Sequence, residues 1–297
     1  MTSNNTFTLH CPAKINLSLL VGKKRTDGFH EIGSLMQTVD LFDEIKLKKM
    51  NESAGKRIFL SNDGTLKWDE NNLIFKAVKS IENLTGEVFP FNIELKKNIP
   101  SCGGLGGGSS DAAFILRFSK FFYKLSARKI FSIALSLGSD IPFFLYSGTC
   151  IIFGRGERII IKEDLRKYCV EIFLPASKVS TKTAFNYIDK NKIADEIDKG
   201  NLFTLYKLLK KCNLENVKNY SENTFERFLL SNDNEIKLKY KEATGKNGLF
   251  TRISGSGSTV FTVFKENCSN NFFVGSEEVY NLNEYRWISA SQNIIES

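Results

Sequence analysis

The chain has 297 residues, 42% of them hydrophobic, and carries a formal net charge of +8. This length suffices for one large domain or two ordinary ones, and the hydrophobic fraction is typical of a globular protein with a buried core. No run approaches the roughly 20 apolar residues of a membrane span, and the polar first eight residues lack a signal-peptide core, so we expect a soluble, cytoplasmic protein without a membrane partner.

The positive charge suits an anionic small molecule, although nucleic acid would also be attracted. Lysines lie in short scattered groups, such as residues 46–49 and 207–211, which is typical of a solvated surface, so no nucleic-acid partner is expected. The six cysteines are far apart and form no C-x-x-C pair, which favours free thiols. Cys102 borders a glycine loop, where packing is the simpler explanation for it.

The first half of the chain mixes strands and helices. Between residues 7 and 21 apolar side chains occupy alternate positions, the period of a half-buried strand, and Lys14 and Asn16 fall on its other face. Pro12 predicts a bulge or a sheet edge. Helices are predicted over 72–84, 110–125 and 130–137, and Gly138 ends the last of them. Asp140 follows at once, before an apolar run, and 149–161 indicates a hairpin.

Residues 103–113 carry the strongest local signal. Five of these eleven positions are glycine, so backbone N–H groups can face a concavity without side-chain obstruction. A strand over 91–95 precedes the loop and a helix follows it, and this order creates an anion site at the helix N-terminus. Ser109 and Ser110 suit the N-cap and can also reach a phosphate or a magnesium ion. The segment therefore predicts phosphate binding, without the Walker or dinucleotide glycine spacing.

A second α+β unit follows a charge-rich turn near 162–168. It opens with a strand over 170–174, continues through lysine-rich amphipathic helices over 181–240, and returns to a strand over 259–264. We expect domains at 1–164 and 165–297. The residues after Asn267 contain strand-like pieces to which no function is assigned.

Three segments in this order resemble the conserved motifs of the GHMP kinases: residues 12–17, 100–113 and 254–261. The resemblance covers about residues 7 to 264. Four segments single out, within that superfamily, a resemblance to the kinases of 4-diphosphocytidyl-2-C-methyl-D-erythritol in the non-mevalonate isoprenoid pathway; they are residues 25–31, 105–110, 137–143 and 223–226. The fold implied is α+β with two lobes, the first resembling ribosomal protein S5 and the second ferredoxin-like, with the site between them.

The resemblance implies transfer of the ATP γ-phosphoryl group to the C2 hydroxyl of the methylerythritol unit. Asp140 would be the catalytic base, accepting the hydroxyl proton, and Lys14 would offset charge on the γ-phosphate. Asn16 projects to the same side as Lys14 and would orient either group. For the cytidine, Phe29 would stack on the base, His30 would read its edge, and Phe185 would form a second wall; core packing explains Phe185 equally well.

The resemblance implies that the glycine loop surrounds the ATP phosphates. Asn72 and Lys97 match family positions near the adenine. The predicted ATP-binding residues are Asn72, Lys97, Pro100, Gly103, Gly104, Leu105, Gly106, Gly107, Gly108, Ser109 and Ser110. The third motif, Gly255, Ser256 and Gly257, would approach the substrate phosphates. The Mg²⁺ ligands are unknown: no carboxylate pair is fixed by spacing, and the ion would bind mainly to ATP with Ser109 or Ser110. A monomer or weak homodimer is expected.

Two alternatives stay open at this point. Another GHMP kinase, for homoserine or phosphomevalonate, would share the glycine loop but not the cytidine end. A non-catalytic nucleotide-binding or nucleic-acid-binding protein would share the fold, although the presence of both Lys14 and Asp140 argues against it.

Overall fold

The computed structural model describes residues 6–50, 57–101, 103–165, 168–265 and 295–296, and the description below is confined to them. Within these residues seven strands form one sheet and three form a second. The first sheet has the order β10-β1-β2-β4-β3, with β5 beside β2 and β6 beside β5. Its strands are β1 (Thr6–Lys24), β2 (His30–Lys49), β3 (Phe59–Ser61), β4 (Phe91–Lys96), β5 (Thr149–Gly154), β6 (Arg158–Ile161) and β10 (Ile295–Glu296).

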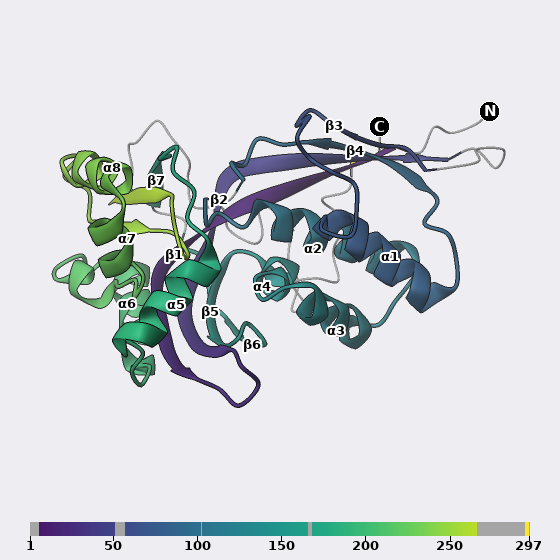
Figure 1. Ribbon diagram of the computed structural model, residues 1–297. Helices are drawn as coiled ribbons and strands as arrows, with labels where there is room; N and C mark the ends of the chain where they lie inside the picture. Colours follow the sequence, from purple (N-terminus) through teal and green to yellow (C-terminus); the bar gives the residue numbers. More distant parts are fainter. Residues whose placement is uncertain (1–5, 51–56, 102, 166–167, 266–294, 297) are drawn as a thin grey trace.

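The long β1–β2 hairpin runs through the middle of the molecule, between α1–α4 on one side and α6–α8 on the other (Figure 1). Strand β2 pairs with β5 over residues 32–37 and with β4 over residues 44–49. One strand therefore connects two parts of the sheet. The strand predicted over 7–21 and the hairpin predicted over 149–161 are both confirmed.

The register of β1 against β2 shifts between Pro12 and Ala13, which confirms the predicted bulge. The bulge changes the face to which alternate residues point. Before it, Leu9 and Cys11 join the core beneath the helices; after it, Ala13 and Ile15 join a second core. The polar residues of this part of β1 are buried as well, so the expected half-buried strand is in fact covered on both faces.

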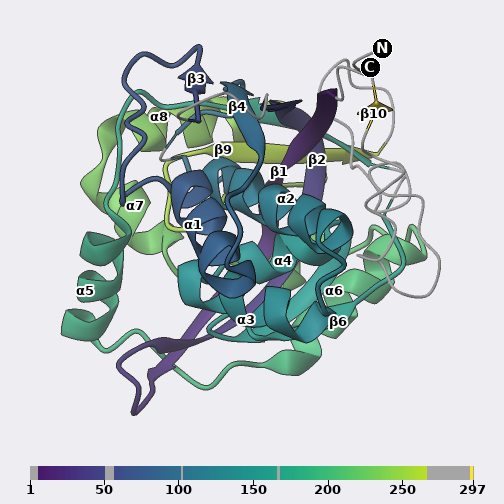
Figure 2. The same cartoon turned by 90° about the vertical axis from the view of Figure 1, so that its right-hand side faces the viewer.

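Four helices cover one face of the first sheet (Figure 2): α1 (Leu73–Thr85), α2 (Gly107–Phe122), α3 (Ala127–Leu137) and α4 (Ile141–Tyr146). Gly138 ends α3 as predicted, its N–H donating to the carbonyl of Ala134 at 3.2 Å. Helix α2 begins three residues earlier than predicted, because Gly106 takes a left-handed conformation (φ +73°) that no side chain opposes. The prediction that Ser109 or Ser110 is the N-cap is therefore wrong.

The second half of the chain forms the sheet β7-β9-β8 and helices beside it. Its elements are β7 (Tyr168–Phe173), α5 (Thr181–Asn191), α6 (Lys199–Lys210), the 3₁₀ turn η1 (Val217–Tyr220), α7 (Glu226–Asn232), α8 (Asn234–Thr244), β8 (Phe250–Ile253) and β9 (Val260–Lys265).

The core between the two sheets is continuous. Ala13 and Ile15 of β1 belong to the same buried cluster as Leu205 of α6 and Phe261 of β9. In addition, β10 pairs with β1, so the end of the chain contributes to the first sheet. The division at 164/165 falls between β6 and β7 and stays a prediction.

Among the described residues, no helix is long and apolar enough to cross a membrane. Cys11, Cys150 and Cys212 are not in disulfides, as predicted, but Cys169 is disulfide-bonded, so the expectation of free thiols is wrong there. Cys102 and the segment 266–294 lie outside the described residues.

Glu226, the first residue of α7, allows a test of the packing between α7 and β8. Its Oε1 accepts the N–H of Ile253 at 2.8 Å, and burial raises the pKa of this carboxyl to about 7. Since the folded pKa lies above the unfolded one, stability conferred by the protonated form is complete below about pH 4.3 and is lost as the pH rises towards 7. A Gln at this position keeps the acceptor without the charge.

We therefore predict that Glu226→Gln has nearly wild-type stability at pH 4.5 and is more stable than wild type at pH 8, by at most about 4 kcal/mol. Urea unfolding across this pH range measures the difference. Parallel stability curves for the two proteins would show that the Glu226 carboxyl does not take up a proton on folding.

Candidate active site

The glycine loop lies between β4 and α2, as the sequence predicts, and contacts the other two motifs through backbone atoms. The N–H of Lys14 donates to the carbonyl of Leu105 at 2.9 Å, and the N–H of Thr259 donates to that of Gly103 at 3.1 Å. Gly104 has φ +77°, and a Cβ there would lie 2.1 Å from the carbonyl oxygen of Ser254. Any side chain at this position would push the glycine loop and the third motif apart.

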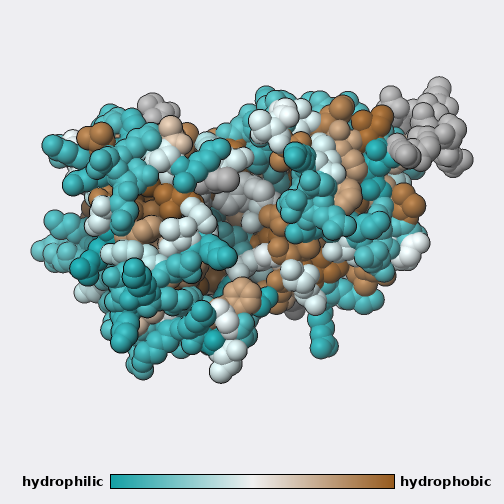
Figure 3. Space-filling model, in the orientation of Figure 1, coloured by the Kyte–Doolittle hydropathy of each residue, from teal (hydrophilic) through white to brown (hydrophobic). Residues whose placement is uncertain are grey.

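Two cavities, of about 780 and 390 Å³, open beside this loop and share Gly104, Ser109 and Asp140 among their lining residues. The smaller is lined by predicted ATP-binding residues, including Asn72, Lys97 and Pro100. The larger is lined by the predicted substrate residues Asn16, Phe29, His30 and Phe185, together with the third motif. In Figure 3 the surface is hollowed between the two halves of the molecule, with white and brown atoms where the outer helices are teal.

Lys14 and Asp140 meet beside the junction of the cavities. The Lys14 Nζ lies 3.5 Å from Asp140 Oδ2 and donates to Asn16 Oδ1 at 2.7 Å. The lysine is 2% exposed, whereas the Asp140 side chain is about one-third exposed, so the carboxylate remains open to a ligand. Asp140 directly precedes α4. Gly156 has φ +121°, and a Cβ at that position would lie 2.2 Å from the carbonyl oxygen of Ser139, the residue before Asp140. The close approach of these two backbones fixes the turn that presents Asp140.

The third motif is held against β1 by Asn16 and Asn223. Asn16 Oδ1 accepts the N–H of Gly255 at 2.9 Å, and Asn16 Nδ2 donates to the hydroxyl of Ser34 at 2.9 Å. Asn223 Nδ2 donates to the carbonyls of Ile253 and Gly255, at 2.6 and 2.9 Å. Sequence reasoning singled out residues 223–226 but gave Asn223 no role; an Asn just before a predicted helix suggests only a cap.

At the far end of the larger cavity, aromatic rings form a layered wall. The ring of His30 stacks on Phe185, with centroids 4.9 Å apart, and Phe185 meets Phe225 edge-on at 5.0 Å. Phe29 is 47% exposed, and the guanidinium of Arg155 lies over its ring at 4.5 Å. The structure therefore brings the predicted Phe29, His30 and Phe185 to one cavity and adds Arg155, which sequence reasoning missed.

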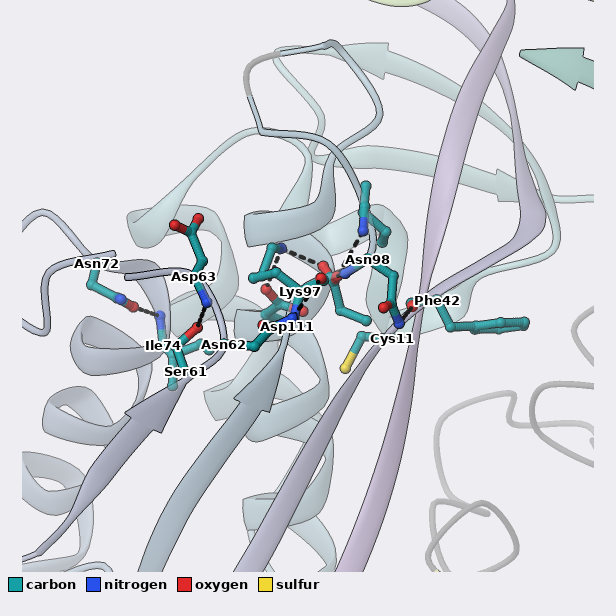
Figure 4. Close-up of polar contacts among 12 residues, drawn as sticks. Cys11, Phe42, Ser61, Asn62, Asp63, Asn72, Ile74, Lys97, Asn98 and Asp111 are labelled. Atoms are coloured by element: carbon teal, nitrogen blue, oxygen red, sulfur yellow. Dashed lines mark hydrogen bonds and ion pairs between the residues drawn. The ribbon is translucent and has the colours of Figure 1, made fainter. Parts of the chain in front are cut away.

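In the smaller cavity, Asn72 and Lys97, the two residues predicted near the adenine, already form hydrogen bonds or ion pairs within the protein. Asn72 is the N-cap of α1: its Oδ1 accepts the N–H groups of Ile74 and Phe75, and its Nδ2 donates to the carbonyl of Lys67 at 3.0 Å. The Lys97 ammonium forms an ion pair with Asp43. It forms a second one, at 3.0 Å, with Asp111 (Figure 4).

This Lys97–Asp43–Asp111 cluster ties the segment before the glycine loop to the helix after it. Asp43 Oδ1 accepts the N–H groups of Asn98 and Ile99, at 2.6 and 2.9 Å, while Asp111 belongs to α2. Burial raises the pKa of Asp111 to about 7, and Lys97 opposes that shift. The cluster thus holds the two ends of the glycine loop together.

The described residues contain no group of three or more His, Cys, Asp or Glu side chains arranged for a metal ion. Two serine hydroxyls lie close to the predicted phosphate site instead. Ser109 lines both cavities, and the hydroxyl of Ser110 is buried without a hydrogen-bond partner in the structure. A nucleotide-bound ion with one serine contact fits this donor set better than an ion held by the protein alone.

Comparison with known proteins agrees with this geometry. Residues 72–148 match the GHMP kinases N terminal domain. The chain is 36% identical to 4-diphosphocytidyl-2-C-methyl-D-erythritol kinase of Pseudothermotoga lettingae over 251 residues, which cover 84% of this chain and 89% of the relative. The chain belongs to this kinase family. It is also 39% identical, over 85% of its length and 87% of the relative's, to the protein of the same name from Thermodesulfovibrio yellowstonii.

Comparison with solved structures indicates the same fold. A crystal structure of 4-(cytidine 5'-diphospho)-2C-methyl-D-erythritol kinase has a TM-score of 0.70 and 26% identity, over 86% of this chain and 89% of the other. Homoserine kinase from Cytophaga hutchinsonii has a TM-score of 0.65 at 18% identity, over 100% and 94% of the two chains, which shows a common fold alone. The predicted two-lobed GHMP kinase architecture is thus confirmed.

The buried cluster yields a prediction about Lys97. Removing its ammonium leaves two buried carboxylates without a cation, so Lys97→Met should lower the free energy of unfolding by about 3–5 kcal/mol. Urea unfolding of the nucleotide-free protein measures this, with Lys96→Met as the control, since that neighbouring side chain is exposed. Unchanged stability with a raised KM for ATP would mean instead that the Lys97 side chain acts mainly by contacting the nucleotide.

Proposed function

We propose that this chain transfers the γ-phosphoryl group of ATP to the C2 hydroxyl of 4-diphosphocytidyl-2-C-methyl-D-erythritol, giving the 2-phosphate and ADP. The observation that carries the proposal is the Lys14–Asp140 pair, 3.5 Å apart, beside the place where the two cavities meet. One cavity adjoins the glycine loop and suits a nucleotide; the other ends in aromatic rings and suits a second, base-containing molecule.

The chemistry then follows from the position of each group. Phosphoryl transfer depends mostly on positioning and charge neutralisation, with little covalent help from the protein. Asp140 accepts the proton of the attacking hydroxyl, because its carboxylate faces both cavities. The Lys14 ammonium stabilises the negative charge that develops on the transferring phosphoryl group, and Asn16 fixes the direction of that ammonium.

The glycine loop supplies backbone N–H groups at the start of α2, where the first helical amides have no partner within the helix. The third motif approaches the same phosphates from the other side through Gly255, Ser256 and Gly257. Magnesium would bind the ATP phosphates with Ser109 as its protein contact and would neutralise part of their charge. At the cytidine end, Phe29 and Phe185 offer rings for stacking and His30 offers its polar edge. A cytoplasmic location and a monomeric or weakly dimeric state stay predictions.

The proposed activity is tested by measuring ADP release from Mg²⁺-ATP with three acceptors: 4-diphosphocytidyl-2-C-methyl-D-erythritol, homoserine and mevalonate phosphate. Turnover of the cytidyl substrate alone is the expected result. Turnover of either other acceptor instead would keep the kinase chemistry and reject the cytidine site. ATP binding without turnover of any acceptor would favour a non-catalytic protein.

For the catalytic pair, we predict that Asp140→Asn lowers kcat by about 10²–10⁴-fold, because the amide cannot accept the hydroxyl proton, while KM for ATP changes little. Lys14→Met should lower kcat as well, through lost stabilisation of the transferring group. Steady-state kinetics measure both effects, and thermal unfolding confirms that each variant is folded. An Asp140→Asn enzyme with more than a tenth of wild-type kcat would contradict the assignment of the base.

A further inference from the structure

His30 is held in the larger cavity by a carboxylate from the other half of the chain. Its Nε2 lies 2.8 Å from Oδ1 of Asp189, near the end of α5, and its ring is nearly parallel to Phe185, at an interplanar angle of 23°. The His30 side chain is 6% exposed, whereas that of Asp189 is 38% exposed. Both the position and the plane of the imidazole are therefore fixed.

The hydrogen bond to Asp189 also determines which ring nitrogen carries the proton. The hydrogen bond from the imidazole of His30, together with the charge of Lys24, lowers the pKa of Asp189, so its carboxylate is ionised at neutral pH. An ionised carboxylate only accepts hydrogen bonds, so the His30 Nε2 must donate. In a neutral ring Nδ1 is then an acceptor. In the described part of the chain, no hydrogen bond reaches Nδ1.

An acceptor at this point distinguishes the two common pyrimidines. Cytosine presents an amino group, a donor, where uracil presents a carbonyl oxygen, an acceptor. We propose that Asp189 is a specificity-determining residue: by holding His30 with Nδ1 unprotonated, it makes the cavity accept a cytosine edge and reject a uracil edge. This inference rests on the proposed function, because it assumes that the base of the substrate lies against His30.

The proton position can be measured without any substrate. The chain has two histidines, His10 and His30, so long-range ¹H–¹⁵N spectra of ¹⁵N-histidine-labelled protein at pH 8 contain two imidazole patterns, and His10→Gln assigns them. The expected result is an Nε2–H ring at His30 in the wild type and a shift towards Nδ1–H in Asp189→Asn, whose amide can also donate. A wild-type His30 with the proton on Nδ1 would overturn the proposal.

The consequence for specificity is measured with the cytidine diphosphate substrate and its uridine analogue. In Asp189→Asn the amide can either accept from Nε2–H or donate to an unprotonated Nε2, so His30 is free to present a donor to uracil. We expect kcat/KM for the uridine analogue to rise about tenfold, with a change of less than about threefold for the cytidine substrate. A merely structural role for Asp189 would lower both values.

Two variants serve as controls. Asp189→Glu keeps an ionised acceptor and should keep wild-type selectivity. Glu196→Gln removes a carboxylate that is 90% exposed and contacts only Lys23, at 3.9 Å, among the described residues, and should leave the ratio unchanged. If wild type turns over the cytidine substrate but Asp189→Asn has the same ratio, the inference fails and the proposed function stands. If wild type turns over neither pyrimidine substrate, the proposed function fails and the inference with it.

Discussion

The buried ammonium of Lys14 is the constraint on which the arrangement of the site depends. A charge taken out of water is costly unless it is paired and hydrogen-bonded. Here the partners come from two places: Asn16 on the same strand, at 2.7 Å, and Asp140 before α4, at 3.5 Å. The bulge at Pro12 turns this part of β1 so that Lys14 faces the glycine loop while Ala13 and Ile15 pack into the second core. The fold and the proposed catalytic geometry are thus set by the same few residues.

The same interaction connects segments that are distant in the chain. Asn16 Oδ1 accepts from both Lys14 and the Gly255 N–H, which joins β1 to the loop between β8 and β9. Gly104 permits the glycine loop to touch that loop directly. As a result, the smaller cavity and the larger, aromatic-lined cavity share lining residues, and in the proposed reaction the reacting groups of the two ligands meet there.

Much of this arrangement could be predicted from the sequence, but the ion pairs between distant elements could not. Alternating apolar residues located β1, and the glycines located the loop between β4 and α2, because both signals are local. The resemblance to GHMP kinases predicted that Lys14 and Asp140 lie close together, although they are 126 positions apart in the sequence. The pairing of Lys97 with Asp43 and Asp111, and that of His30 with Asp189, could not be predicted. Each joins charged residues on different elements, and nothing in the spacing of such residues indicates which of them will meet.

The central claim is that the two cavities deliver a tertiary alcohol and the ATP γ-phosphate to Lys14 and Asp140. It is tested most directly by ³¹P NMR of the product formed from Mg²⁺-ATP and 4-diphosphocytidyl-2-C-methyl-D-erythritol. A phosphate on the tertiary C2 oxygen has no hydrogen on the adjoining carbon, so the new phosphomonoester signal should lack three-bond proton coupling. A doublet or triplet would place the phosphate on a secondary or primary hydroxyl, and the absence of any new signal would mean that no transfer occurs; either result would contradict the account.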